Sequence, residues 1–257
     1  MPKSPEHRHD RDHPSSLARR VILVTGAGDG IGKAASVAFA AQGARLVLLG
    51  RTRRKLEQVS DTIQARRLET PLIVPVDLHG LGPEQAKTLA EGINREFGGL
   101  DGVLHNASIV GPKVPIERFP LDEFRKVLSV NFDSAVVLTQ ALLPLLSQSA
   151  DASVVFTSSG VGKRGRAYFG AYAVSKFATE GLAEVLADEL RNTTRIRVNV
   201  VDPGPTRTAL RAAGFPSEDP MSLPAPEDHM PLYLFLMGPE SAGVTGRRFS
   251  AKGWRAG

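Results

Sequence analysis

Tyr172 and Lys176 lie four residues apart and are the pair in this sequence best suited to acid–base chemistry. Four residues make about one helical turn, so on a helix the phenol and the ammonium share a face. A free tyrosine has a pKa near 10, and a cation one turn away is expected to lower that pKa toward the useful range. Ser159, thirteen residues before the tyrosine, could hold a carbonyl oxygen during proton transfer. Such pairs also occur by chance on surface helices, so the interpretation depends on the rest of the chain.

A glycine-rich turn follows the first predicted strand, residues 21–25, which is apolar and suits a buried parallel strand. Gly26, Gly30 and Gly32 fit the spacing Thr-Gly-x-x-x-Gly-x-Gly, and an apolar helical pattern comes next. Backbone N–H groups and the positive helix end can face a pyrophosphate there, and glycines let the backbone come close. Strand, turn and helix together predict a dinucleotide site, with an ordinary tight turn as the alternative.

The second predicted strand, residues 45–50, indicates which dinucleotide is bound. In the NAD-binding form, an acidic side chain at the end of this strand holds the ribose 2′-hydroxyl, whereas a nearby arginine accommodates a 2′-phosphate. Here the strand ends in Leu and Gly, and Arg51 follows. The sequence therefore predicts NADP(H), with Arg51 as the main contact and Arg53 or Arg54 as candidate helpers. Some of these arginines are expected to be solvated charges.

These motifs have the order and spacing of a known family. The sequence resembles the single-domain short-chain dehydrogenases/reductases (SDR family) over roughly residues 20 to 250. The residues that carry the resemblance are Thr25-Gly26-x-x-x-Gly30-Ile31-Gly32, Asn106-Ala107, Asn131, Ser159, Tyr172-x-x-x-Lys176 and Pro203-Gly204. Further segments (156–159, 170–173, 175–181, 203–209 and 230–234) resemble its YciK-type branch, bacterial oxidoreductases whose substrate is poorly defined. The resemblance implies an α/β fold, with a Rossmann-type doubly wound parallel sheet and helices on both faces, in a single domain from residue 20 to 257.

The resemblance also implies roles for individual residues. Tyr172 would be the acid or base, and Lys176 would lower its pKa and hold the nicotinamide ribose. Ser159, which the family's spacing selects over Ser158, would polarise the carbonyl, and Asn131 would hold a water that links the lysine to solvent. The implied cofactor contacts are Gly26, Gly28, Asp29, Gly30, Ile31, Arg51, Asp77, Leu78, Asn106, Ala107, Tyr172, Lys176, Pro203, Gly204, Thr206 and Thr208. No metal site is expected.

Some of these positions have simpler structural interpretations. Asp77 could cap a helix or a turn, and the proline-containing segment 203–208 could be an ordinary exit loop. His105 is expected to be buried and hydrogen-bonded to backbone rather than to act as a base. Ser108 stands where the family usually has glycine, and so puts a small side chain where the backbone of the family runs close to the cofactor.

Residues 209–230 are rich in proline and poorly periodic. A long irregular segment in an enzyme domain is often functional, and this one is expected to be a mobile lid over the substrate. Arg207, Arg211, Phe215 and Met221 are the residues expected to reach the substrate.

Composition is consistent with one enzyme domain. A chain of 257 residues is long enough for one well-buried α/β core. The absence of cysteine excludes disulfides, thiolate metal sites and cysteine nucleophiles, and suits a reducing cytoplasm. No apolar run reaches the ~18–20 residues of a membrane helix, and the longest, 135–146, is interrupted by Thr139-Gln140 and Pro144 and is expected to be a buried helix. Residues 1–19 are expected to form a disordered basic tail rather than a signal peptide.

The sequence thus predicts an oxidoreductase that transfers a hydride between NADP(H) and a carbonyl/alcohol substrate, mainly as a reductase of ketones or aldehydes. We expect a small-molecule substrate, no nucleic acid and no membrane as partners, a cytoplasmic location, and a homodimer or homotetramer as in the family. A non-catalytic dinucleotide-sensing protein on the same fold is one alternative. The net charge of +5 raises nucleic-acid binding as another, although no nucleic-acid motif accompanies the arginine clusters.

Overall fold

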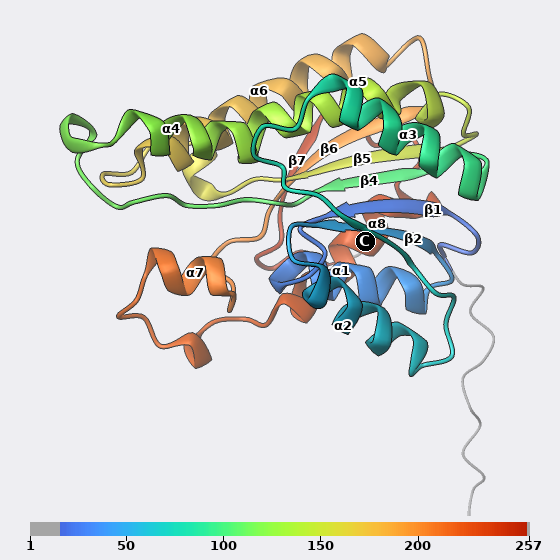
Figure 1. Cartoon of the computed structure of the whole chain (residues 1–257), viewed down its shortest axis with the longest axis horizontal. Helices are drawn as coiled ribbons and strands as arrows, with labels where there is room; N and C mark the ends of the chain where they lie inside the picture. The colour runs from blue at the N-terminus through green and yellow to red at the C-terminus, as the bar shows by residue number, and fades with distance from the viewer. Residues whose placement is uncertain (1–15, 256–257) are drawn as a thin grey trace, which may run out of the picture.

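A seven-stranded parallel sheet with helices on both faces forms the centre of the protein in a computed structural model, which describes residues 16–255 (Figure 1). The strand order is β3-β2-β1-β4-β5-β6-β7. The strands are β1 (Val21–Thr25), β2 (Arg45–Gly50), β3 (Leu72–Pro75), β4 (Gly102–His105), β5 (Ala152–Thr157), β6 (Ile196–Asp202) and β7 (Arg247–Ser250). The order runs outward from β1 in both directions, so the sheet is doubly wound and the predicted fold class is confirmed.

Helices cover the two faces of the sheet in two layers (Figure 1). One layer consists of α1 (Gly30–Ala41), α2 (Arg53–Gln64) and α8 (Met230–Met237). The other consists of α3 (Pro83–Phe97), α4 (Leu121–Leu128), α5 (Ser134–Leu146) and α6 (Gly170–Leu190). Short 3₁₀ helices cover Ile116–Arg118, Gly160–Gly162, Pro220–Ser222, Pro226–His229 and Pro239–Ser241.

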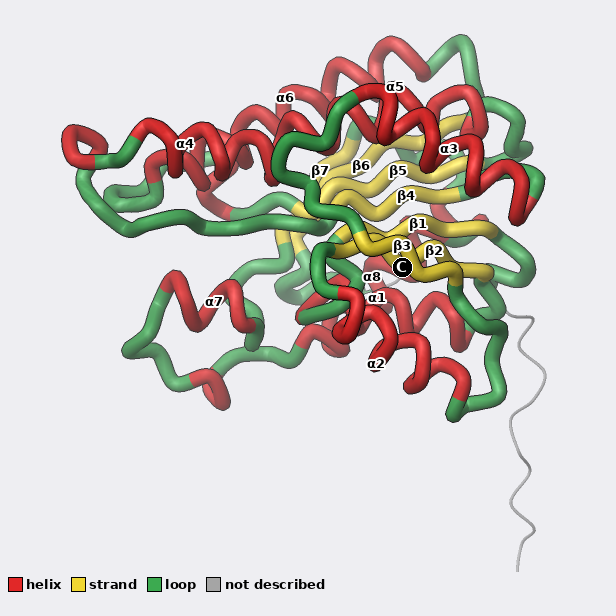
Figure 2. Tube along the Cα trace, viewed as in Figure 1, coloured by secondary structure: helices red, strands yellow, loops and turns green. Residues whose placement is uncertain are grey.

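The central strands are buried because both faces of the sheet are covered. Every residue of β1, β4 and β5 is buried. One hydrophobic core lies beneath α3, α5 and α6 and includes Leu138 and Leu186. A second core lies beneath α1, α2 and α8 and includes Phe39 and Tyr233. The remaining helix, α7 (Ala209–Gly214), lies away from the sheet, beyond the carboxyl ends of the strands (Figure 2).

α4 and α5 form one continuous helix through a π-helical segment, Ser129–Asp133. This helix, Leu121–Leu146, is the one helix among residues 16–255 that is long and apolar enough to cross a membrane by length and composition. The sequence expectation recognised only the second half of this helix, 135–146, as an apolar run and so missed its full length. In the structure the helix packs against α3 and α6, so it is part of one helical layer of the domain.

The chain is already packed before β1 begins. Most of the expected tail, residues 1–15, lies outside the described residues. Leu17 is fully buried, and its N–H donates to the carbonyl oxygen of Gln42 at 3.1 Å. Arg20 forms an ion pair with Asp151 at 3.0 Å. The domain boundary expected at residue 20 therefore falls inside packed chain.

Candidate active site

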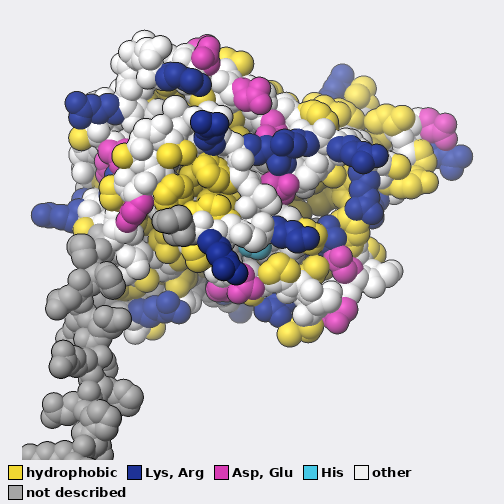
Figure 3. All heavy atoms as spheres, turned by 180° about the vertical axis from the view of Figure 1, so that it is seen from behind, with side chains coloured by type: hydrophobic (Ala, Val, Ile, Leu, Met, Phe, Trp, Pro, Cys, Tyr) yellow, Lys and Arg dark blue, Asp and Glu magenta, His cyan; other side chains and the backbone are white. Residues whose placement is uncertain are grey.

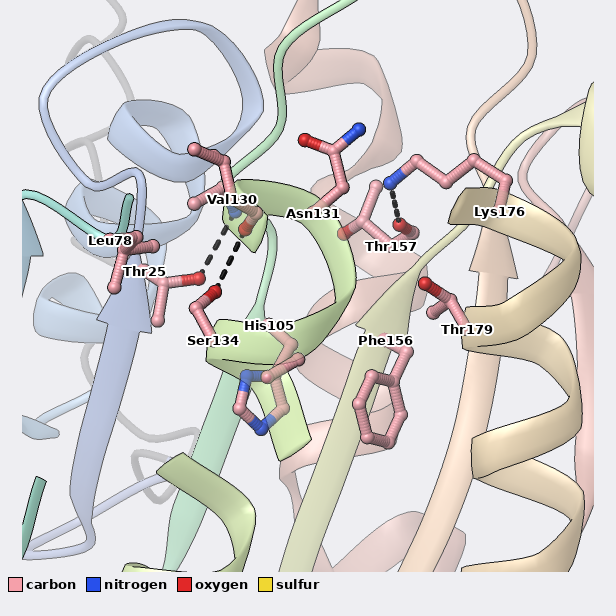
Figure 4. A pocket seen from close by; sticks show the side chains of 12 residues that line it. Thr25, Leu78, His105, Val130, Asn131, Ser134, Phe156, Thr157, Lys176 and Thr179 are labelled. Atoms are coloured by element: carbon pink, nitrogen blue, oxygen red, sulfur yellow. Dashed lines mark hydrogen bonds between the residues drawn. The ribbon is translucent and has the colours of Figure 1, made fainter. Parts of the chain in front are cut away.

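The first two turns of α6 bring Tyr172 and Lys176 to the same side of the helix. Both side chains are nearly buried, with 8% and 3% of their surfaces exposed. The Lys176 Nζ atom lies 5.7 Å from the centroid of the Tyr172 ring, and it donates a hydrogen bond of 2.8 Å to the carbonyl oxygen of Thr157 at the end of β5 (Figure 4). The predicted pair therefore lies at the carboxyl edge of the sheet, where open α/β sheets bind ligands.

The expectation that Lys176 lowers the pKa of Tyr172 is wrong for this structure. Burial raises the pKa of Tyr172 to about 12, and hydrogen bonding with Ser159 opposes this rise. Burial also lowers the pKa of Lys176 to about 8, against the effect of the Glu180 charge. The phenol is thus protonated at neutral pH, which suits a proton donor.

The two serines after β5 point in different directions, as alternation along an extended strand requires. The Ser158 hydroxyl is buried and donates to Glu180 Oε1 at 2.5 Å. Ser159 is half-buried, and its hydrogen bonding with Tyr172 is one of the influences on the phenol pKa. The structure therefore places Ser159, the serine selected by spacing, beside the tyrosine.

Asn131 occupies the π-helical segment between α4 and α5. Its Oδ1 atom accepts from the Ile109 N–H at 2.8 Å, and its Nδ2 atom donates to the Ile109 carbonyl at 2.9 Å. The same Nδ2 atom donates to Ser175 Oγ at 3.0 Å. Asn131 thus connects the loop after β4 to α6, one residue before Lys176.

A small internal cavity lies between these elements (Figure 4). Its lining includes Thr25, Leu78, Asn131, Thr157 and Lys176, and it offers about 10 Å³ to the centre of a water molecule. A polar cavity of that size holds about one water. Asn131 and Lys176 both border this cavity.

His105 borders the same cavity but is a poor candidate base. Its Nε2 atom lies 3.0 Å from Thr139 Oγ1, and its ring stacks on Phe156 with centroids 4.8 Å apart. Burial lowers the pKa of His105 to about 3, so the ring stays neutral at pH 7. It is buried as expected, but its partner is the Thr139 side chain and not backbone.

The glycine-rich turn is closed against the end of β4. Gly26 has φ of +66°, and a Cβ there would lie 3.0 Å from the Ala107 Cα atom. A Cβ on Gly32 would collide with the Gly26 carbonyl oxygen. The Thr25 hydroxyl accepts from the backbone N–H groups of Asn106 and Ala107 at 2.9 and 3.0 Å. These glycines form a cradle (the turn Gly26–Gly32) in which neighbouring backbone atoms occupy the space that side chains would need.

Asp29 and Lys55 form an ion pair across the cradle at 2.5 Å. Asp29 Oδ1 also accepts from the Gly30 N–H at 2.8 Å and so caps α1, while Ile31 lies half-buried in its first turn. The hydrogen bond from Lys55 is the main reason that the pKa of Asp29 is lowered. Sequence reasoning missed Lys55, whose contact depends on α2 packing over Gly28.

Arg51 follows β2 and is exposed. Its side chain forms no ion pair or hydrogen bond with any residue from 16 to 255. Arg53, by contrast, lies 3.7 Å from Glu57 in an i,i+4 pair. Of these two arginines, Arg51 is the one whose guanidinium is available for an anion.

Asp77 and Leu78 follow β3 in different environments. The exposed Asp77 carboxylate accepts from the His79 N–H at 3.0 Å, which is the turn interaction that the sequence left open. Leu78 is buried in the core beneath α3 and lines the small cavity.

The segment after β6 turns sharply out of the sheet. Gly204, next to Pro203, has φ of +68°, and its N–H donates to Asp202 Oδ1 at 3.0 Å. The Thr206 hydroxyl is buried against His229 Nε2 at 2.9 Å, so this hydroxyl is engaged inside the protein. Thr208 caps α7 by accepting from the Arg211 N–H at 3.1 Å.

Thr208 also closes one side of the cradle. A Cβ added to Gly30, which has φ of +49°, would lie 3.0 Å from the Thr208 methyl group. A cleft of about 400 Å³ extends from Gly30 past Thr208 to Phe215 and Leu223. The exit loop and the segment 209–230 therefore face the cradle across this cleft.

The segment expected to be a lid contains regular structure. It consists of α7 and of the 3₁₀ helices Pro220–Ser222 and Pro226–His229. Arg211 binds Glu218 with two hydrogen bonds of 2.6 and 2.7 Å, and Arg207 Nη1 lies 3.1 Å from the sulfur of the exposed Met221.

Arg248 of β7 joins several parts of the site and was missed by sequence reasoning. It donates to Glu180 Oε1 at 2.8 Å and to Asp202 Oδ2 at 3.1 Å. Its Nη2 atom also donates to the carbonyl oxygen of Ser159 at 3.2 Å. One guanidinium thus connects α6, the end of β6 and the loop that carries Ser159.

Among residues 16–255 no group of three or more His, Asp or Glu side chains is placed to hold a metal ion.

Comparison with known proteins places these features in context. The family model described as short chain dehydrogenase matches residues 20–219. YciK of Escherichia coli K12, described as an uncharacterized oxidoreductase, is 48% identical over 244 residues, covering 95% of this chain and 96% of that protein. A short chain dehydrogenase structure from Pseudomonas syringae has 54% identity and a TM-score of 0.91, covering 93% of this chain and 97% of that one. Another, from Shigella flexneri 2a and complexed with NADP, has 48% identity and a TM-score of 0.90, covering 93% and 100%.

Proposed function

Because the chain belongs to the short chain dehydrogenase family of oxidoreductases, we propose that it reduces the carbonyl group of a ketone or aldehyde with NADPH. The observation that carries this proposal is the placement of three side chains. A protonated Tyr172 lies beside Ser159 and one turn from Lys176, at the carboxyl edge of the sheet. The cradle opens at the same edge.

The residues present fit a dinucleotide. The cradle has no room for side chains at Gly26 and Gly32, which is the property that lets backbone approach a pyrophosphate at a helix N-terminus. Arg51 offers an available cation at the end of β2, where a 2′-phosphate is bound in this fold. The NADP in the Shigella flexneri structure supports the same preference here.

Each part of the cofactor has candidate partners in this chain. NADPH, when bound, supplies the hydride. The residues we propose to hold it are Gly26, Gly28, Asp29, Gly30 and Ile31 for the pyrophosphate, Arg51 for the 2′-phosphate, Asp77 and Leu78 for the adenine side, Asn106 and Ala107 along the cradle, Tyr172 and Lys176 for the nicotinamide ribose, and Pro203, Gly204, Thr206 and Thr208 for the carboxamide. For Thr206 the backbone is the candidate group, since its hydroxyl binds His229.

The chain's own residues supply the proton. Tyr172 donates its phenolic proton to the carbonyl oxygen, and the Ser159 hydroxyl donates a hydrogen bond to the same oxygen as negative charge develops there. The Lys176 ammonium, 5.7 Å from the ring centroid, stabilises the phenolate left behind. A water in the small cavity, shared with Asn131, would return a proton to the pair.

Exposed apolar side chains on α6 support self-association. Val174, Phe177 and Val185 of α6 are 46–56% exposed, and apolar patches of this kind often mark protein interfaces. We propose a homodimer or homotetramer that uses α6, in the cytoplasm, as the absence of cysteine suggests. Light scattering at several protein concentrations tests the assembly, and a monomer at all of them would reject it.

The test of the function is the substitution Tyr172→Phe. We expect it to retain NADPH binding, measured by cofactor fluorescence, and to lower turnover by at least ~10²-fold. Tyr168→Phe is the matched control, because it removes the hydroxyl of an exposed tyrosine. Turnover is followed by NADPH absorbance against ketones, aldehydes, quinones and 3-oxoacyl thioesters.

Two outcomes would reject parts of this proposal. Unchanged turnover in Tyr172→Phe would remove the tyrosine as the acid. NADPH binding without turnover of any carbonyl by the unaltered protein would favour the alternative, a non-catalytic dinucleotide-sensing protein on the same fold.

A further inference from the structure

Three cationic side chains lie over the faces of two aromatic rings at the mouth of the site. The rings are Phe169, which precedes α6, and Phe215, which follows α7, with centroids 5.4 Å apart. Lys113 Nζ lies 4.9 and 4.8 Å from the two centroids. The Arg166 guanidinium lies 5.8 and 5.0 Å from them, and the Arg211 guanidinium lies 3.5 Å from Phe215.

This cation–aromatic cluster borders the ring of Tyr172. Phe169 and Tyr172 belong to one hydrophobic cluster, against which Phe215 packs, and the Phe169 and Tyr172 ring centroids are 6.3 Å apart. Arg211 is close enough for its charge to influence Tyr172. Figure 3 shows Lys and Arg side chains around a hollow between the part of the molecule that carries α4 and the part that carries α7.

The positive charge of the cluster is only partly compensated. Glu218 binds Arg211 through both of its oxygens, so one of the three cations is neutralised. Lys113 uses one N–H to bind the Gly214 carbonyl at 2.5 Å, which brings no negative charge. The exposed Arg166 side chain forms no hydrogen bond or ion pair with any residue from 16 to 255.

Holding the lid does not require these extra charges. The contact between Phe215 and Phe169, whose ring planes are tilted by 31°, already connects α7 to the start of α6, and the Arg211–Glu218 pair joins two parts of the segment 209–230. A ring face satisfies the charge of a cation but not its N–H donors, and a guanidinium has five of them. The charges of Arg166 and Lys113, which no ion pair among residues 16–255 neutralises, attract ligands of the opposite sign.

We propose, on the basis of the hydride-transfer function above, that the substrate is an anionic carbonyl compound. Its apolar or aromatic body packs against the half-buried Phe215, its carbonyl reaches Tyr172, and its oxyanion group, a carboxylate or a phosphate, binds Arg166 and Lys113. The planar guanidinium suits two-point binding of either oxyanion, and the ammonium adds a point charge.

Matched probes that differ only in the anionic group test this proposal. The carboxylate arm compares 4-acetylbenzoate with its methyl ester, and the phosphate arm compares 4-acetylphenyl phosphate with 4-methoxyacetophenone. The readout is kcat/KM with NADPH where a probe is reduced, and otherwise its inhibition constant against the best substrate of the carbonyl panel. We expect a preference of ~10-fold or more for the anion, about 1.4 kcal/mol, that weakens with added salt. The arm with the larger preference identifies the oxyanion.

Variants then assign the preference to residues. Arg166→Gln and Lys113→Gln should reduce the ratio of anionic to neutral probe toward one, with the larger loss on the anionic probe. Arg118→Gln, which removes an exposed arginine that lies 3.5 Å from Glu117 outside the cluster, is the control and should keep the wild-type ratio.

The possible outcomes separate this inference from the function on which it rests. Equal kcat/KM or inhibition for anionic and neutral probes would overturn the inference and leave carbonyl reduction standing. A preference that survives both Arg166→Gln and Lys113→Gln would also overturn it. Bound NADPH with no reduction of any carbonyl would reject the proposed function and the inference together.

Discussion

The cradle and the lid, which face each other across the cleft, are built by opposite means. In the cradle, function depends on side chains being absent, because backbone fills the space beside Gly26 and Gly32. In the segment expected to be a lid, residues 209–230, Phe215 is held by side chains: a neighbouring aromatic ring and three nearby cations. A close contact between rigid backbone segments leaves no space for an added atom. A group of flexible side chains can lose one member while the others keep their contacts. We therefore expect changes in the cradle to abolish cofactor binding and changes in the lid to alter selectivity in steps.

Gly32→Ala should have the largest effect, since its Cβ would meet the Gly26 carbonyl oxygen, which is part of the backbone. We expect NADPH affinity to fall by ~10²-fold or more, about 2.7 kcal/mol, and the free energy of unfolding to fall by roughly 1–3 kcal/mol from overpacking. Fluorescence titration and chemical denaturation measure the two quantities. Gly92→Ala is the control, because nothing lies within 4 Å of that site in α3, and should stabilise by up to ~1 kcal/mol. If Gly32→Ala bound NADPH with wild-type affinity, the expected difference between the cradle and the lid would be wrong.

Arg51→Ala should be the next largest effect and tests a side chain on the cradle side. Removing an available guanidinium from a 2′-phosphate should weaken NADPH by ~10-fold or more and NADH by less than ~2-fold. Arg53→Ala, which removes a residue paired with Glu57, should change neither constant appreciably. Equal losses for the two cofactors in Arg51→Ala would remove the 2′-phosphate assignment.

Arg248→Met should lower kcat by about tenfold, or about 1.4 kcal/mol in the barrier, because the Ser159 loop would lose its link to Asp202 and Glu180. NADPH affinity should stay within ~2-fold of wild type, since Arg248 does not touch the cradle. Arg248→Lys should recover part of the rate by keeping one ion pair. Arg247→Met, an exposed neighbour in β7, is the control. A rise in KM alone would contradict a positioning role.

The smallest expected effect is on the pH dependence of reduction. Lys176 is charged below its pKa of about 8, so the ammonium that stabilises the phenolate is lost as the pH rises through that value. Tyr172, with a pKa of about 12, remains protonated throughout. We expect kcat at saturating NADPH to be constant below pH 7 and to fall by about twofold at a pH equal to the lysine pKa. Lys176→Met should be slow without this decline, and a wild-type rate that stays constant to pH 10 would argue against the lysine.

Local patterns in the sequence predicted the fold. Buried runs such as 21–25 and 45–50 coincide with β1 and β2. Tyr172 and Lys176 are one helical turn apart, and the structure brings both to the same side of α6, as that spacing predicts. It also places Ser159, which the family's spacing implied, beside the tyrosine.

The features that the sequence did not predict depend on packing between distant segments. Arg248 meets the Ser159 carbonyl across 89 residues of sequence, and Lys113 meets Gly214 across 101. The pKa of Tyr172 was predicted in the wrong direction because spacing indicates a nearby cation but not the extent of burial. The contacts of Arg248 and Lys113 depend on the order in which the strands assemble into the sheet. A short sequence motif does not contain that order.

The π-helical segment at Ser129–Asp133 has a consequence for how the chain tolerates changes in length. An inserted residue turns a helix by about 100°, so α4 and α5 present faces that are out of phase with each other. Deleting one residue there would restore a regular helix, but it would rotate α4 about its axis and carry Val127 out of the core. This short stretch thus sets the angular phase of one helix relative to the next, and its length is coupled to the position of Asn131.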